Sequence, residues 1–375
     1  MPEIMPGWWL SGTAATSRPQ VLVLVARCPG TPVRVRTSQG SDGTKVTMPP
    51  RGTIESMETA PPTDHRPTLM TVHAHPDDET IGTGGAMAKA VATGHRVVLV
   101  TGTRGEMGEI VVPEMDTAEN HRRLGEIRAA ELERAMDALG VTEWENLGYH
   151  DSDMMGRPGN HDPRSFWRAD LDEAAGRLVW LVRRYQPDVM TTYNDFGGYG
   201  HPDLIRVHDA SGSSFARAGD TAWYPEQLAP EHGGTGPASD DGGLAPWAPS
   251  KLYEQAIPAS VRHAMRDALE EMGRPSIWSP PADATPEQLA EWEAHMAKML
   301  VPDEQVTTWI DISGDPLERK WRAMHEHVSQ ISTESTFMLF GLDGWRKAWA
   351  KEAYILREST VGRVRPEDDL FAGLG

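Results

Sequence analysis

Residues 69–79 read Leu-Met-Thr-Val-His-Ala-His-Pro-Asp-Asp-Glu, and this stretch decides the fold. Its first residues form a short apolar run, which is typical of a central strand in a parallel sheet. The run then turns polar, and residues 80–93 have the composition of a helix. The polar residues at this turn are two imidazoles and three carboxylates: His73, His75, Asp77, Asp78 and Glu79. Because open α/β sheets bind ligands at the carboxyl ends of their strands, the stretch predicts both a fold class and the place of a site.

Two interpretations of these carboxylates compete. In the first, Asp77 or Asp78 caps the helix and Glu79 lies at the positive end of its dipole. That accounts for one or two carboxylates but not for the histidines beside them. In the second, histidine and aspartate bind zinc, and a further carboxylate acts as a general base on bound water. We favour the second interpretation, which predicts a metal-dependent hydrolase. A dinucleotide-binding loop is excluded, because three carboxylates would face the pyrophosphate.

The rest of the chain repeats the pattern of strand and helix. Strands are predicted at residues 96–101, 144–147, 189–193, 251–256 and 306–312, and helices at 117–139, 170–185, 259–299 (with a break at 278–281) and 316–331. This alternation indicates an α/β fold with a Rossmann-like, mostly parallel sheet flanked by helices. The last third of the chain is predicted to form a smaller C-terminal lobe around the cleft.

A second polar segment follows the strand predicted at 189–193. Two glycines, Gly197 and Gly198, bend a loop there, and Tyr199 and His201 come directly after it. A tyrosine hydroxyl and an imidazole are suited to stabilise an oxyanion and to protonate a leaving amine. Asp203, two residues on, is predicted to orient His201 and raise its basicity.

Composition excludes several classes of partner. The formal net charge is −19 and the sequence pI is about 5.1, so the surface repels phosphate backbones and nucleic-acid binding is not expected. No apolar run approaches 18 residues, so no membrane span is expected. The single cysteine, Cys28, has no partner for an internal disulfide. These features favour a cytoplasmic protein and leave its oligomeric state undecided.

Residues 1–66 differ in composition from the rest of the chain, with Pro, Gly, Ser, Thr and Arg scattered without period. We predict a disordered N-terminal extension, and a start codon assigned too early, with Met57 as the alternative start, is its simplest explanation. Residues 67–375 are predicted to form the folded domain. A Gly-, Pro- and Asp-rich segment at about 219–249 is predicted to be a flexible insert.

The motifs resemble those of a known family. His75-Pro76-Asp77-Asp78-Glu79 resembles the signature of the PIG-L, or LmbE-like, zinc N-deacetylases, which act on N-acetylglucosamine units of small glycoconjugates. Further segments resemble the family in the same order: 105–110, 126–128, 147–152 and 197–203. The resemblance covers residues 67–375 and is strongest with the actinobacterial mycothiol branch, which holds a deacetylase and an S-conjugate amidase. Residues 113–116, 251–253 and 370–373 lean toward the amidase.

The resemblance implies roles for individual residues. Zinc (Zn²⁺) is the expected cofactor, with His75 and Asp78 as ligands, and a small glycoconjugate is the expected substrate. The implied catalytic residues are Asp77 as general base, with Tyr199, His201 and Asp203. The implied substrate-binding residues are Glu109, Arg128 and Asp151. Without the resemblance, Arg128 is interpreted as the partner of Glu126 or Glu131 within its own helix.

One position departs from the family pattern. The usual motif is His-Pro-Asp-His, whose last histidine is the third zinc ligand, and this chain has Leu204 there. His208 lies one helical turn further and is a weak substitute candidate, since an ordinary partly buried histidine explains it better. The sequence therefore predicts a zinc-dependent amidohydrolase. The alternative is a metal-poor, non-catalytic sugar-binding homologue.

Overall fold

The computed structural model describes residues 66–375 apart from 230–242, 274–278, 281–282, 364–365 and 375. The predicted N-terminal extension therefore lies outside the described residues, except for Arg66, and so does the middle of the predicted insert at 219–249. In the described part of the chain, no helix is long and apolar enough to cross a membrane.

The described residues contain a mixed sheet built around β1 (Thr68–His73). Its strand order is β3 (Glu143–Asn146), β2 (Arg96–Thr101), β1, β4 (Val189–Thr192), β5 (Lys251–Pro258), β8 (Lys351–Ser359) and β7 (Thr308–Asp311), and β6 (Leu300–Val301) pairs with β5. The strands from β3 to β5 are parallel, and β8 runs antiparallel to both of its neighbours. All six residues of β1 are buried, as expected of a central strand covered on both faces.

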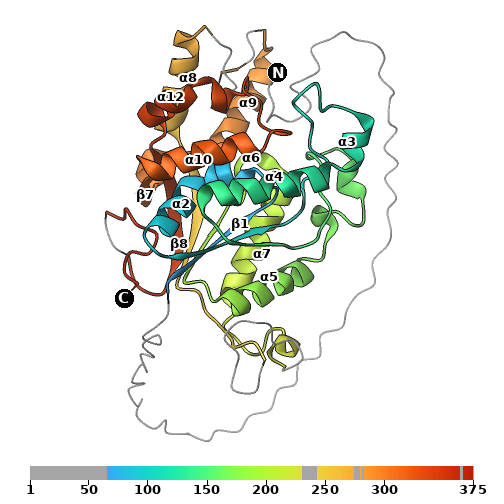
Figure 1. The fold of residues 1–375 in the computed structure, drawn as a ribbon, viewed down its shortest axis with the longest axis vertical. Coiled ribbons are helices and arrows are strands. Elements are labelled where there is room, and N and C mark those ends of the chain that lie inside the picture. Colours follow the sequence, from blue (N-terminus) through green and yellow to red (C-terminus); the bar gives the residue numbers. More distant parts are fainter. Residues whose placement is uncertain (1–65, 230–242, 274–278, 281–282, 364–365, 375) are drawn as a thin grey trace, which may run out of the picture. The chain divides into compact units, whose positions relative to one another are not determined.

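Helices cover both faces of this sheet. The helices are α1 (Asp78–Gly82), α2 (Gly84–Ala92), α3 (Ala118–Arg122), α4 (Leu124–Leu139), α5 (Leu171–Tyr185), α6 (Gly197–Gly200), α7 (Pro202–Arg217), α8 (Ala259–Glu271), α9 (Pro286–Met299), α10 (Asp315–Glu326), α11 (Thr336–Leu339) and α12 (Gly341–Ala348). Figure 1 shows α2, α4 and α10 packed together on one side of the sheet and α5 and α7 on the other. The predicted α/β fold class with a mostly parallel sheet is confirmed.

The C-terminal part of the chain is tied to the start of the fold through the buried carboxylate of Glu352. Lys320 on α10 lies 2.6 Å from Glu352 on β8, and both side chains are buried. The Glu352 carboxylate also accepts the main-chain N–H groups of Gly85 and Ala86, at 2.8 Å each. Glu352 thus satisfies the first turn of α2, a helix that comes soon after the signature stretch.

Three predicted helices end or break where the sequence pattern continues. The helix predicted at 80–93 is two helices, because Thr83 leaves helical geometry and Glu352 caps the second one. The helix predicted at 117–139 breaks at Arg123. The helix predicted at 316–331 ends at Glu326, so His327 lies in a loop. In each case contacts from distant parts of the chain or local geometry override an unbroken helical pattern.

The first turn of α9 carries a complete capping box, which allows a test of local stability. The Thr285 hydroxyl accepts from Gln288 N–H at 3.3 Å, and the Gln288 side chain accepts from Thr285 N–H at 2.9 Å. We expect Thr285→Ala to lower the free energy of unfolding by about 1 kcal/mol, the usual cost of losing an N-cap. Urea unfolding measures this change. Thr285→Ser, which keeps the hydroxyl, is the matched control and should stay near wild type.

Candidate metal centre

The signature stretch forms a strained turn between β1 and α1. Asp77 occupies the N-cap position of α1 with φ 123° and ψ −37°, in the left-handed half of conformational space that residues other than glycine rarely adopt. Its side chain makes no capping hydrogen bond to the helix. Asp77 therefore holds the N-cap position that the capping interpretation gave it, but its carboxylate does not cap the helix. Strained main chain of this kind is concentrated at functional sites.

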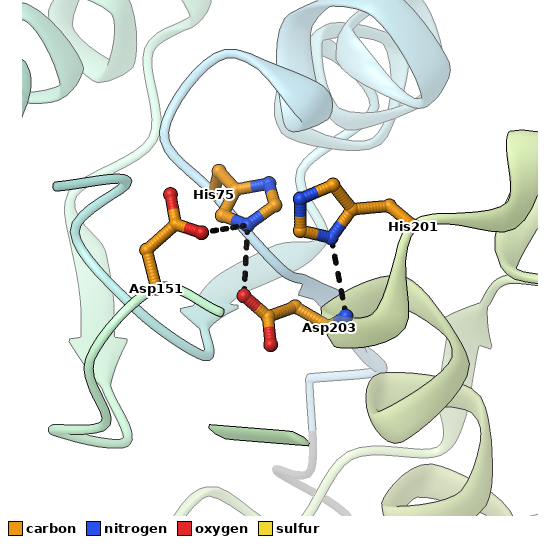
Figure 2. A group of neighbouring side chains, drawn as sticks. All are labelled: His75, Asp151, His201 and Asp203. Atoms are coloured by element: carbon orange, nitrogen blue, oxygen red, sulfur yellow. Dashed lines mark hydrogen bonds and ion pairs between the residues drawn. The ribbon is translucent and has the colours of Figure 1, made fainter. Parts of the chain in front are cut away.

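His75 lies at the centre of a buried group of polar side chains. Its Nε2 is 3.2 Å from Asp203 Oδ2 and 3.8 Å from Asp151 Oδ1, while its Nδ1 is 3.4 Å from Asp78 Oδ2. Figure 2 shows the Asp151 and Asp203 carboxylates converging on the same ring nitrogen. Because a carboxylate only accepts, His75 presents its Nε2–H to Asp203, and when the ring is protonated it also presents its Nδ1–H to Asp78.

This arrangement fits a divalent metal ion. Tetrahedral zinc with ligands at about 2.0–2.1 Å places two ligand atoms about 3.3–3.4 Å apart, and His75 Nδ1 and Asp78 Oδ2 are 3.4 Å apart. A carboxylate on the second nitrogen of a metal-binding histidine, here Asp203, is the usual supporting contact at such sites. Among the described residues, His75, Asp151, His201 and Asp203 offer ligand atoms that lie within 4.8 Å of one another.

The pKa shifts of His75 and Asp78 agree with a metal site at this pair. Burial lowers the pKa of His75, but the Asp151, Asp203 and Asp78 carboxylates outweigh it and raise that pKa well above its ordinary value. Burial raises the pKa of Asp78, but the hydrogen bond and charge of His75 outweigh it, so that the pKa falls. The pair is a stable anionic and cationic couple when no metal is present, and a metal ion would replace the proton between them.

The Asp77 carboxylate pairs with Arg128. Its Oδ1 is 3.1 Å from the Arg128 guanidinium, which also donates to the carbonyls of Pro76 at 2.6 Å and Gly105 at 2.9 Å. Burial raises the pKa of Asp77 to about 6, although the charge of Arg128 opposes the rise. A carboxyl group with such a pKa is suited to general-base work near neutral pH.

The alternative interpretation of Arg128 as an intrahelical partner is wrong. Glu131 instead accepts from the main chain and hydroxyl of Ser329, and Glu126 pairs with Arg123. Arg128 is 3% exposed and holds the signature turn and the glycine loop together. Its role toward a substrate stays a prediction.

His201 begins α7 and is oriented by main chain. Its Nδ1 accepts the N–H of Asp203 at 3.1 Å, so the ring proton of neutral His201 sits on Nε2 and this nitrogen is a donor. Burial and the neighbouring His75 lower the pKa of His201 to about 4, which keeps the ring neutral. The Asp203 carboxylate does not orient His201 as predicted. It bonds to His75 and to the main chain and hydroxyl of Ser152 instead.

Tyr199 lies beside His201 at the end of the glycine loop. The two ring centroids are 6.2 Å apart, and Gly198 supplies the kink before Tyr199 with φ 67°. Burial and the charges of Asp78, Asp77 and Asp151 raise the pKa of Tyr199 well above its ordinary value. The hydroxyl therefore keeps its proton at neutral pH and can serve as a hydrogen-bond donor.

Leu204 and His208 both have other surroundings that account for them. Leu204 is 2% exposed and belongs to the hydrophobic core, with its Cδ2 beside Gly198. His208 lies 3.0 Å from the Tyr193 carbonyl oxygen and 3.6 Å from Glu254, and it is not among the clustered ligand residues. His208 is therefore explained by its own partners.

The predicted substrate-binding residues lie in different surroundings. Asp151 is 3% exposed, accepts from the N–H of Met107 and of Asp153, and joins the His75 cluster. Glu109 is exposed, and its main-chain carbonyl accepts from Gln330 at 3.1 Å. The structure thus brings Asp151 to the metal-binding group, and it places Glu109 next to the C-terminal segment.

Sequence reasoning missed the contacts that two residues, Tyr193 and His327, make around this site. Tyr193 accepts from the N–H of Ala74 at 3.2 Å and lies 2.9 Å from His73, so it braces the strand end that precedes His75. His327 reaches Glu79 from the far end of the chain. Only the position of Tyr193 at a predicted strand end could have suggested it, since neither contact is encoded in local spacing.

The sequence is similar to a known protein family and to named relatives. The family model described as PIG-L, GlcNAc-PI de-N-acetylase, matches residues 70–213. A deacetylase of 1D-myo-inositol 2-acetamido-2-deoxy-alpha-D-glucopyranoside from Geodermatophilus obscurus is 39% identical over 82% of this chain and 97% of its own length. A deacetylase of the same description from Frankia alni is 42% identical over 81% of this chain and 99% of its own.

A solved structure matches the same fold. The N,N'-diacetylchitobiose deacetylase from Pyrococcus horikoshii aligns with a TM-score of 0.50 and 19% identity, over 78% of this chain and 84% of that one. At this identity the match speaks for the fold alone.

Proposed function

The chain belongs to the PIG-L family of N-deacetylases, and from this premise we propose that it is a zinc-dependent amidohydrolase acting on an N-acetylglucosaminyl-inositol. The relatives from Geodermatophilus obscurus and Frankia alni are described as deacetylases, which favours deacetylation over the S-conjugate amidase activity suggested by segments of the sequence. The observation that carries the proposal is the strained, half-buried Asp77, which comes directly before Asp78 and two residues after His75, so that a candidate base adjoins a candidate pair of metal ligands.

The proposed mechanism divides the work among a few side chains. When bound by His75 and Asp78, zinc supplies a Lewis acid and lowers the pKa of a water molecule. Asp77 takes a proton from the attacking water while Arg128 holds its carboxylate in place. The Tyr199 hydroxyl and the Nε2–H of His201 donate hydrogen bonds to the oxyanion that develops on the amide oxygen.

The leaving amine needs a proton when the carbon–nitrogen bond breaks. Protonated Asp77, which has just accepted a proton from water, is the suitable acid, because His201 is neutral and its remaining proton is engaged at the oxyanion. The products are acetate and a primary amine. Asp77 therefore passes the proton that it took from water to the amine, and its carboxylate is regenerated.

The experiment that tests this function is direct. Purified protein loaded with one equivalent of zinc is incubated with N-acetylglucosaminyl-inositol, and primary amine and acetate are measured. We expect equal amounts of both products. A protein that binds the sugar without releasing amine at any zinc concentration would contradict the proposal and match the sugar-binding alternative.

Tyr199 offers a test of the oxyanion donors. We expect Tyr199→Phe to lower kcat by about 10²-fold, because one donor to the oxyanion is lost while His201 supplies the other. Steady-state amine release gives kcat, and a circular dichroism melt confirms the fold. Tyr149→Phe is the matched control, since the Tyr149 hydroxyl bonds to Glu173 away from the cluster. Equal losses in the two variants would contradict a role for Tyr199 in the site.

A further inference from the structure

The strained conformation of Asp77 needs partners that hold it. A residue other than glycine at φ 123° persists only when its surroundings compensate the strain, which costs on the order of 1–3 kcal/mol. Arg128 holds the side chain of Asp77. The main-chain N–H of Asp77 donates to Glu79 Oε2 at 2.8 Å, so the Glu79 carboxylate holds the main chain of the same residue.

Glu79 is in turn held by a histidine from the other end of the chain. Its Oε1 lies 2.8 Å from Nε2 of His327, which is 248 residues later, and both side chains are fully buried. A buried carboxylate with one oxygen unpaired carries a large desolvation cost. The contact with His327 therefore fixes the plane of the Glu79 carboxylate, and that plane sets where Oε2 meets Asp77.

The loop that carries His327 is itself anchored. The His327 carbonyl accepts the N–H groups of Gln330 at 3.0 Å and Ile331 at 2.8 Å. Ser329 binds the Glu131 carboxylate on α4 through its main-chain N–H at 2.8 Å and its hydroxyl at 2.7 Å. Because α4 also carries Arg128, one helix supports both the side chain of Asp77 and the loop that holds His327.

We propose that His327 is a positioning residue for the general base, acting through Glu79 on the main chain of Asp77. The inference rests on the proposed function, in which Asp77 accepts a proton from water. His327 does not touch the reacting atoms. It links the C-terminal segment to the signature turn, so that the strained conformation of Asp77 depends on a residue outside the signature.

The test compares two replacements of His327. His327→Leu removes the donor to Glu79, and His327→Gln keeps an N–H donor at a similar distance from the main chain. We expect His327→Leu to lower kcat about tenfold or more, with KM and bound zinc within about twofold of wild type, because displacing a catalytic group slows the chemical step. His327→Gln should recover most of the lost kcat.

Ser329→Ala is the matched control. It weakens the anchoring of the same loop at Glu131 but leaves the contact between Glu79 and His327. We expect a lower melting temperature with kcat near wild type. The inference is overturned if His327→Leu keeps its kcat, or if kcat falls in Ser329→Ala as much as in His327→Leu. Should His327→Leu fail to fold, His327→Asn, whose amide is too short to reach Glu79, takes its place with the same expectation.

A second measurement separates this inference from the proposed function. If the wild-type protein releases no amine, the proposed function fails, and crystal structures of wild type and His327→Asn then decide the inference. Relaxation of Asp77 to a negative φ in the variant supports it. An unchanged Asp77 at positive φ overturns it.

Discussion

Replacing Asp77 with asparagine is expected to lower kcat by about 10²-fold or more while the amount of bound zinc stays near wild type. Asparagine has nearly the same shape and keeps both structural contacts of the position. Its side-chain oxygen can still accept from Arg128, and its main-chain N–H can still donate to Glu79. The asparagine side chain lacks the basic carboxylate of Asp77, whose pKa burial raises to about 6. The expected loss is therefore chemical and not structural.

Two measurements on two variants make this prediction specific. The rate of amine release gives kcat, and metal analysis after gel filtration gives the zinc content. Asp78→Asn is the comparison, because Asp78 lies 3.4 Å from His75 Nδ1 and is proposed as a ligand. We expect Asp78→Asn to lose zinc. If Asp77→Asn loses zinc and Asp78→Asn retains it, the roles of base and ligand are reversed.

The sequence predicted the elements that rest on local pattern. The apolar run before His75 made β1 recognisable as a buried strand, and the polar cluster at its end predicted a site at the carboxyl edge of the sheet, where the structure brings His75 together with Asp151 and Asp203. The same reasoning failed for the helix predicted at 80–93. That helix breaks at Thr83, where Glu352 caps a new first turn from far along the chain, and no local pattern encodes such a contact.

The choice of partners within the site also lay beyond the sequence. Spacing suggested that Asp203 would orient His201, since the two are close in the chain. In the fold, the Asp203 carboxylate points to His75, and its main-chain N–H meets His201 instead. Likewise, the position of Arg128 between apolar residues of its helix did not reveal that it would pair with Asp77. Which acid meets which base depends on tertiary packing and not on distance along the chain.

Replacing Leu204 with histidine is expected to raise zinc affinity by about 10²-fold, or about 2.7 kcal/mol. Leu204 occupies the position at which the family motif carries its third ligand, and a buried leucine side chain offers no ligand atom. A catalytic zinc normally has three protein ligands, whereas only two, His75 and Asp78, are proposed here. Changes in outer-shell support alone alter metal affinity by about 10–100-fold, so gaining a ligand should do at least as much.

The replacement has a structural cost that the experiment can use. Leu204 is packed in the core with its Cδ2 beside Gly198, and an unpaired imidazole there costs about 1–3 kcal/mol. We therefore expect Leu204→His to melt below wild type without zinc and to gain more than wild type when zinc is added. Leu204→Gln is the matched control, because its amide is polar but a poor zinc ligand, and its melting temperature should not rise further than that of wild type when zinc is added.

Zinc titration against a competing chelator decides between three explanations of the native site. In the first, wild type binds zinc more weakly than Leu204→His, and His208→Ala binds zinc as tightly as wild type. Two protein ligands then hold the metal, and His208 contacts Tyr193 and Glu254 instead, as in the structure. In the second, wild type binds zinc as tightly as Leu204→His, and His208→Ala binds none. His208 then moves to the metal, and the prediction is wrong. If no variant binds zinc, the buried polar cluster around His75 holds no metal, and the sugar-binding alternative is then favoured over the hydrolase.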